Sequence, residues 1–140
     1  MKIVLDTNVL VSAFLSPRGA PAQILGLILE GYITLCVEPR IVHEYKEVLT
    51  RPQWHFTEED ISGVLDVLLD NAITINAPPL NIELPDPDDL VFVETAAATQ
   101  ADAIVTGNRR HFPKRTTGKI PVLSPSEFLE AVRKKAYPGN

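Results

Sequence analysis

Short runs of apolar residues alternate along the chain with longer segments whose apolar positions recur at helical spacing. The short runs predict strands at residues 2–5, 32–37, 72–76, 103–106 and 120–123. Helical spacing predicts helices at residues 22–30, 39–51, 61–71 and 86–100, and a last helix after Ser124. Parallel neighbours need crossover connections, and the connections here are helical. This order therefore predicts an α/β fold of three layers, α/β/α, around a parallel sheet of about five strands.

Capping and helix-breaking residues mark several of these boundaries. Gly31 suits the end of one helix, and Pro39 suits the first position of the next. Residues 57–60, with the sequence TEED, resemble a capping box in front of residues 61–71. Residues 124–127, with the sequence SPSE, resemble a second capping box that opens the last helix.

Composition limits the class of protein. The 140 residues, 45% of them hydrophobic, fit one domain over residues 1–140. We see neither a basic segment followed by a signal-like apolar stretch nor an apolar run near 18 residues, so we expect no membrane association and a cytoplasmic protein. The single cysteine, Cys36, lies in an apolar run without a disulfide partner or zinc-ligand spacing, and we expect it in the core.

Polar side chains occur where the first and fourth predicted strands end. Asp6 directly follows the first strand, Thr106 ends the fourth, and Asn108 comes two residues later. In open parallel sheets, ligands bind outside the carboxyl ends of the strands. Asp6 therefore lies where such a fold builds its site, although an Asx turn at the strand end is the alternative role for this residue.

Two further acidic segments can reach this edge. At 100° per residue, Glu44 falls at the border of the apolar stripe of its helix, facing either a cleft or solvent. In DPDD, Asp86 suits the N-cap, and Asp88 and Asp89 complement the helix dipole. Asp89 also shares a row with buried positions, where a carboxylate is costly without a cation. Clustered oxygen ligands without Cys or His favour Mg²⁺ or Mn²⁺.

Four segments, in this order, resemble the PIN-domain family, and specifically the small toxin ribonucleases of prokaryotic toxin–antitoxin systems. They are DTNVLVSAF after the first strand, the acid of HEYKEVL, DPDDLVF at the start of an alanine-rich helix, and IVTGNRRHF. Together they span nearly the whole chain. The resemblance implies a PIN-like fold of Rossmann type and a metal-dependent nuclease acting on RNA, with Mg²⁺ or Mn²⁺ as cofactor.

The resemblance also implies roles for individual residues. Asp6, Glu44 and Asp89 match the acidic positions of the family, and Asp86 and Asp88 are the alternatives for the third acid. These acids suffice for one divalent ion.

The chain departs from the family after the fourth strand. Many members carry an aspartate where this sequence has Asn108, which offers an amide oxygen and no charge, so a second ion is less well supported. Thr106 is expected to donate a hydrogen bond to Asp6 or to the scissile phosphate. An antitoxin protein and a homodimer are the partners that the resemblance implies.

Positive charge is concentrated in one stretch. The net charge is −5, yet residues 103–126 contain no acid and five cations, which leaves −10 for the remainder. We expect these cations to contact RNA phosphates, with a solvated loop as the alternative. They are Arg109, Arg110, Lys114, Arg115 and Lys119.

Two other functions compete with nuclease activity. Because Asn108 replaces an acid, the chain could be a degenerate PIN module that binds RNA or a protein without cleavage. A phosphoryl-accepting domain also places an Asp after a parallel strand. Phosphatases of the haloacid dehalogenase type need a second Asp where this chain has Asn8, and receivers need an Asp and a Lys after other strands, which no position fits.

Overall fold

A parallel sheet in the order β3-β2-β1-β4-β5 forms the centre of the computed structural model, which describes residues 1–136. The strands are β1 Lys2–Leu5, β2 Thr34–Val37, β3 Ile73–Thr74, β4 Ala103–Val105 and β5 Val122–Leu123. The helices are α1 Thr7–Leu15, α2 Ala20–Leu29, α3 Pro39–Leu49, α4 Glu58–Asp70, α5 Leu90–Thr99, α6 Lys114–Thr117 and α7 Pro125–Ala136. Short 3₁₀ turns occupy Pro52–Trp54, Pro87–Asp89 and Arg109–His111.

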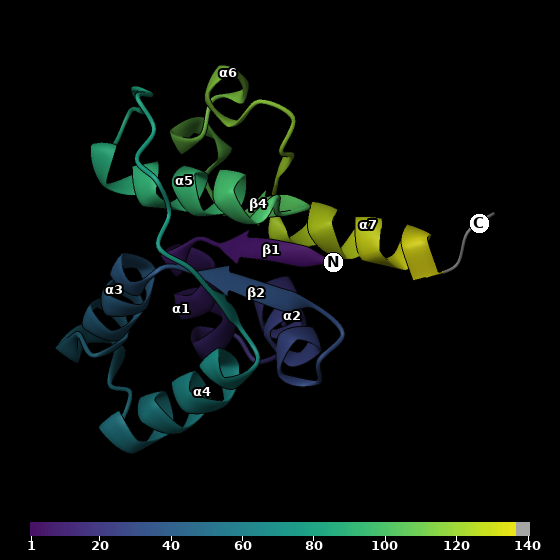
Figure 1. Cartoon of the computed structure of the whole chain (residues 1–140). Helices are drawn as coiled ribbons and strands as arrows, with labels where there is room; N and C mark the ends of the chain where they lie inside the picture. Colours follow the sequence, from purple (N-terminus) through teal and green to yellow (C-terminus); the bar gives the residue numbers. More distant parts are fainter. Residues whose placement is uncertain (137–140) are drawn as a thin grey trace.

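The helices cover both faces of the sheet. Figure 1 shows α5 and α6 on one face and α1, α2, α3 and α4 on the other. The terminal helix α7 packs beside α2 and contacts β4 and β5. The three-layer α/β/α fold with a five-stranded parallel sheet is therefore confirmed.

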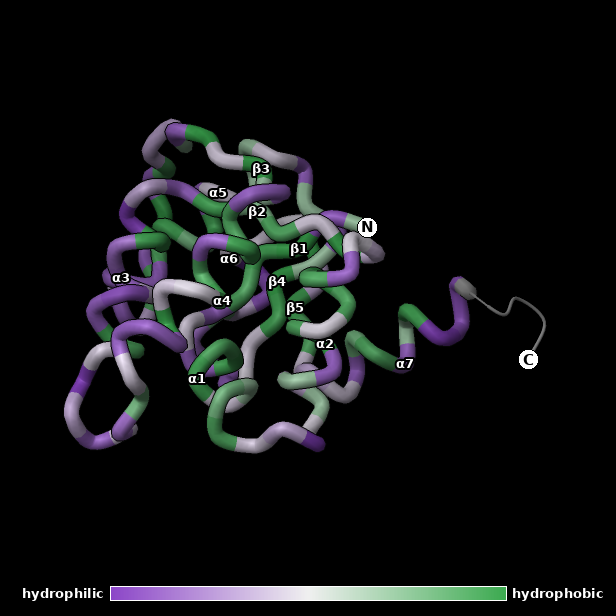
Figure 2. Tube along the Cα trace, turned by 90° about the horizontal axis from the view of Figure 1, so that it is seen from below, coloured by the Kyte–Doolittle hydropathy of each residue, from purple (hydrophilic) through white to green (hydrophobic). Residues whose placement is uncertain are grey.

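The core lies between these layers. The central strands are hydrophobic along their length, and hydrophilic residues lie mainly toward the periphery (Figure 2). Ile3, Val4 and Leu5 of β1 are each at most 1% exposed. A strand with helices on both faces is buried on both sides, which explains why its sequence is continuously apolar. Cys36 of β2 is also fully buried, as expected.

The strand order places a topological switch between β1 and β4. From β1 the chain proceeds to β2 and β3 on one side, then crosses to β4 and β5 on the other. The Asp6 N–H donates to the Val105 carbonyl at 2.9 Å, and the Thr106 N–H donates to the Leu123 carbonyl at 2.9 Å. The carboxyl ends of three adjacent strands are thereby fixed together, at the position where such folds bind ligands.

Several helix boundaries follow from capping. The Ser124 N–H donates to Glu127 Oε1 at 2.9 Å, and the Glu127 N–H donates to Ser124 Oγ at 3.1 Å, so the second capping box is confirmed. Thr57 Oγ1 accepts from the Asp60 N–H at 3.1 Å, and α4 begins at Glu58 rather than after the box.

Other boundaries differ from the prediction. No helix was predicted over Thr7–Leu15, because only Asn8 and Ser12 interrupt its apolar run and mark an exposed face. Strands β3 and β5 contain two residues each, which is shorter than the apolar runs that predicted them. The helix predicted at 86–100 is a 3₁₀ turn followed by α5. No helix within residues 1–136 is long and apolar enough to cross a membrane.

Candidate active site

Asp6 lies at the junction of β1 and α1 with its side chain held from the neighbouring strand. The residue is 4% exposed, and Thr106 Oγ1 donates a hydrogen bond to Asp6 Oδ2 at 2.7 Å. The same Thr106 oxygen accepts from the Asn108 N–H at 3.0 Å. Burial raises the pKa of Asp6 above its ordinary value, and the Thr106 hydrogen bond opposes part of that rise. Of the two expected roles for Thr106, the structure shows the hydrogen bond to Asp6.

Glu44 projects from α3 toward this junction. Its Oε2 accepts a hydrogen bond from the Thr7 hydroxyl, in the first turn of α1. Glu44 is half-buried and lines a pocket of about 420 Å³ together with Asp88. Burial raises the pKa of Glu44, and the charges of Asp6 and Asp88 raise it further. Glu44 therefore faces a cleft, the first of the two orientations that its position on the helix allowed.

The three acids of the DPDD segment have different environments. Asp86 Oδ1 accepts from the Asp88 N–H at 3.0 Å, so Asp86 caps the 3₁₀ turn as predicted. Asp88 is exposed. The side chain of Asp89 is 13% exposed, and its Oδ2 is buried and receives no hydrogen bond. Asp89 is therefore the acid of this segment that turns inward.

Asp89 is electrostatically strained. Burial, followed by the charges of Asp6 and Asp86, raises its pKa to about 6. His111 Nδ1 lies 3.1 Å from Asp89 Oδ2 and opposes the rise, although the geometry between the two atoms is not that of a hydrogen bond. A buried carboxylate oxygen without a donor is the kind of atom that a cation satisfies.

The structure brings Asp6, Glu44 and Asp89 to one edge of the sheet, where the charge of Asp6 raises the pKa of the other two. No group of three or more His, Cys, Asp or Glu side chains in the described part of the chain is placed to hold a metal ion as it stands. Thr106 donates to Asp6 and Thr7 donates to Glu44, whereas His111 Nδ1 lies near Asp89 without a hydrogen bond. The donor chemistry nevertheless fits a hard divalent cation, because carboxylate oxygens are its preferred ligands.

Tyr45 supports the site from below. It is fully buried, and its hydroxyl donates to the Leu5 carbonyl at 2.5 Å, one residue before Asp6. Burial raises the pKa of Tyr45 well above its ordinary value, and the charges of Asp6 and Glu44 act in the same direction. The phenol therefore stays protonated as a donor. Tyr45 lies on the apolar stripe of its helix, so the sequence pattern alone does not single it out, although a buried tyrosine hydroxyl itself indicates a polar partner.

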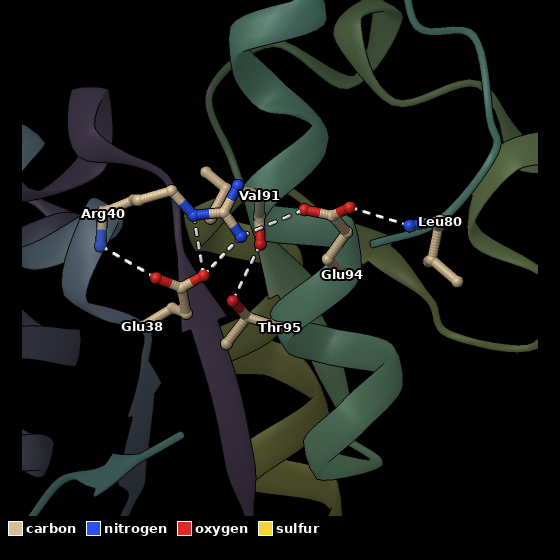
Figure 3. A network of polar contacts seen from close by, with 6 residues as sticks. All are labelled: Glu38, Arg40, Leu80, Val91, Glu94 and Thr95. Carbon is tan, nitrogen blue, oxygen red and sulfur yellow. Dashed lines mark hydrogen bonds and ion pairs between the residues drawn. The ribbon is translucent and has the colours of Figure 1, made fainter. Parts of the chain in front are cut away.

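A second polar network, which sequence analysis missed, lies next to the acids. Arg40 contacts both Glu38 and Glu94, which are 5% and 3% exposed, and Glu94 Oε2 also accepts from the Leu80 N–H at 2.8 Å (Figure 3). Glu94 thereby attaches the proline-rich connection before Asp86 to α5. A glutamate within a nearly all-apolar helix was the available signal, because a buried charge needs a partner.

The basic stretch lies on the surface beyond β4. Arg110, Lys114, Arg115 and Lys119 are exposed, and Arg109 pairs with Glu127 at 3.1 Å. Phe112 is 2% exposed and packs edge-to-face on Phe92, with ring centroids 6.4 Å apart, so it belongs to the core.

The doubly wound sheet and the acids at its switch point define a Rossmann-like domain with a carboxylate site. The family model described as PIN domain matches residues 2–110, which is most of the chain. The chain belongs to the PIN-domain family, whose members are generally nucleases.

Two known proteins are similar to this chain. The uncharacterized protein MJ1680 of Methanocaldococcus jannaschii is 31% identical over 146 residues, covering 96% of this chain and 93% of that protein. A chain of VapBC2 from Rickettsia felis, solved bound to a DNA fragment from its promoter, has a TM-score of 0.58 and 18% identity. That match covers 89% of this chain and 98% of the other, and it shows a shared fold.

Proposed function

We propose that this chain is an endoribonuclease that depends on Mg²⁺ or Mn²⁺ and hydrolyses phosphodiester bonds of single-stranded or structured RNA. The observation that carries the proposal is the carboxylate of Asp89, which has a buried oxygen without a hydrogen-bond donor and lies within the field of Asp6. Such an arrangement costs free energy unless a cation binds there. Membership of a nuclease family supports the same reading.

Asp6, Glu44 and Asp89 would hold the ion. Asp86 is the weaker candidate for the third position because its side chain caps its own turn, and Asp88 is weaker because it is exposed. When bound, a divalent ion supplies charge for a phosphate oxygen and lowers the pKa of an attacking water.

The chain's own residues prepare the site. Thr106 orients Asp6 by donating to Oδ2, and Thr7 orients Glu44 by donating to Oε2. These hydroxyls would fix the rotamers of the two acids, as hydrogen-bond partners of metal ligands commonly do. Asn108 stands beside Thr106 and would offer its amide to the substrate phosphate without adding charge.

RNA would approach over the basic stretch. Arg109, Arg110, Lys114, Arg115 and Lys119 follow Asn108 directly and have exposed side chains. Each phosphate contact would add a salt-dependent increment to the affinity for RNA.

The proposed cellular role is that of a cytoplasmic toxin, a homodimer, that an antitoxin protein neutralises. Support comes from the sequence resemblance to toxin ribonucleases and from the fold shared with a chain of VapBC2. Growth arrest on expression of the chain alone, relieved by coexpression of a protein encoded beside it, would test this role. Unimpaired growth at high expression of the active enzyme would contradict it.

The biochemical test uses purified protein, a labelled RNA and a titration of Mn²⁺. We expect Asp6→Asn to lower metal-dependent cleavage by more than about 100-fold and Thr106→Val to lower it by about 10–100-fold. Asp66→Asn, at an exposed position of α4, is the matched control and should leave cleavage unchanged. Cleavage that survives Asp6→Asn would refute the assignment.

A degenerate module that binds RNA without cleavage is the second candidate. It is favoured by Asn108, which stands where many relatives have an acid, and by the lack of a ready three-ligand group within residues 1–136. Such a module would keep its affinity for RNA in Asp6→Asn and show no Mn²⁺-dependent cleavage in the wild type.

A further inference from the structure

A cavity of about 740 Å³ lies beside β5, apart from the acids. Its apolar lining includes Pro113, Ile120, Pro121 and Val122. Sites for small ligands are typically concave and mainly apolar, with a few polar groups that fix orientation, and their volume is about 300–1,000 Å³. The cavity has these properties.

The charged lining of the cavity is entirely positive. Arg109, Lys114 and Lys119 line it, and no acid does. Neither lysine forms an ion pair within residues 1–136, whereas Arg109 pairs with Glu127. A ligand with an apolar body and a negative backbone is complementary to this combination.

The cavity adjoins a depression that reaches toward the acid site. Arg109 lines both the cavity and a shallow depression that it shares with Asn108. The Asn108 N–H in turn donates to the hydroxyl of Thr106, which contacts Asp6. The depression at Asn108 and the cavity therefore lie on neighbouring parts of the surface, joined at Arg109.

The pocket of about 420 Å³ that Glu44 lines differs in charge. Its lining includes four acids, Glu44, Glu47, Asp88 and Glu94, beside Arg40 and His43. A strand that extends from the acids past Glu47 and Glu94 would meet negative charge, whereas one that extends toward the cavity beside β5 would meet cations.

We propose that this cavity binds a nucleobase of the RNA strand, while Lys114 and Lys119 contact the phosphates on either side of that base. The inference rests on the proposed nuclease function and adds a subsite to it. Bases in single strands are often held on apolar or aromatic platforms next to cations. An acidic, apolar peptide has similar charge complementarity, but a nucleotide also accounts for the position of the cavity beside Asn108 and Arg109.

The test measures binding rather than cleavage. In the Asp6→Asn protein with EDTA, a labelled ten-nucleotide RNA is compared with a series in which one position at a time lacks its base. We expect one position to be sensitive, with an affinity loss of about tenfold relative to the other positions. In Asp6→Asn combined with Ile120→Gln, which makes the cavity lining polar, that sensitivity should disappear.

A second variant keeps the test decisive if Ile120→Gln does not fold. Lys119→Ala should lower the slope of log affinity against log salt by about 0.7, as expected for one lost contact to a single strand. Lys134→Ala removes the same charge from the last turn of α7 and should not change the slope.

Three outcomes overturn the inference. The first is an equal loss of affinity wherever a base is removed. The second is an equal slope of log affinity against log salt in Lys119→Ala and Lys134→Ala. The third is a change in the NMR shifts of the Gly118 and Lys119 amides with an acidic leucine-rich peptide but not with RNA. Cleavage by the wild type is measured separately. If the wild type cleaves RNA but removal of no single base weakens binding, only the cavity inference fails. If removal of one base weakens binding but the wild type never cleaves RNA, only the nuclease proposal fails.

Discussion

Replacing the buried charge of Asp89 gives the sharpest prediction. Asp89→Asn keeps the shape of the side chain and removes a charge that burial and Asp6 disfavour. We expect the metal-free variant to be more stable than the wild type at neutral pH. The same variant should lose Mn²⁺ binding and cleavage, because it lacks the ligand that the proposed site requires.

The magnitude follows from the shifted pKa of Asp89. The ordinary pKa is 3.8 and burial with neighbouring charge raises it to about 6. Each pH unit of difference is worth about 1.4 kcal/mol, so the ionised carboxylate lowers the free energy of unfolding by about 3 kcal/mol. The introduced amide buries an N–H group, which offsets part of the gain. We therefore expect a net stabilisation of about 1–3 kcal/mol.

The sign of the pH dependence is equally specific. Between pH 3.8 and about 6 the native state holds more protons at Asp89 than the unfolded chain, so stability falls as the pH rises through this range. Below that range the group is neutral in both states, and above it the full cost applies. The stability difference between variant and wild type should therefore be small at pH 4 and reach its full value by pH 7.5.

Urea unfolding followed by circular dichroism measures this difference. The experiment is done with EDTA at pH 4, 5, 6 and 7.5, and Asp66→Asn serves as the exposed control that should change stability by less than about 0.5 kcal/mol at every pH. Equal unfolding free energies for wild type and Asp89→Asn at pH 7.5 would show that the carboxylate is not strained, and the case for a cation there would lose its main support.

Three other predictions address the surroundings of the site. Tyr45→Phe should lower stability by about 1 kcal/mol in urea unfolding and weaken Mn²⁺ binding in calorimetry, because the hydroxyl bond next to Asp6 is lost; unaltered metal affinity would exclude a positioning role. Glu94→Ala should cost about 2–3 kcal/mol, and Glu94→Gln less, because the amide retains an acceptor; equal losses would contradict this account. Combining Arg109→Ala with Arg110→Ala should weaken RNA binding and reduce the slope of log affinity against log salt. An unchanged slope would show that these arginines do not contact RNA phosphates.

The layered fold was predictable because it follows from the periodicity of the apolar residues and from the order of strands and helices. Apolar strands buried on both faces and helices between them define a parallel sheet before any contact is known. The lengths of β3 and β5 were not predictable, because an apolar run does not reveal how many of its residues pair with a neighbour. Helix α1 was missed because only two polar residues, Asn8 and Ser12, mark its exposed face.

The sequence predicts that the acids lie at this edge of the sheet, but it does not predict the contacts of their side chains. Asp6 follows a strand, and the strand fixes where its backbone lies. Which oxygen is buried, and what contacts it, depends on side chains from distant segments, such as His111 beside Asp89. The Glu38, Arg40 and Glu94 network is of the same kind, since its partners are far apart in sequence and no spacing rule connects them.

The proposed site contains an arrangement of charges that is unfavourable for stability. Three carboxylates at one sheet edge repel one another, and threonine hydroxyls from α1 and β4's end hold two of them. Stability alone does not require this arrangement, because neutral side chains of the same size would fill the same positions without repulsion. Sites where such conflicts persist are expected to be functional. The third carboxylate, Asp89, has no hydrogen-bond donor for its buried oxygen and carries the largest part of that conflict, which a divalent cation would relieve.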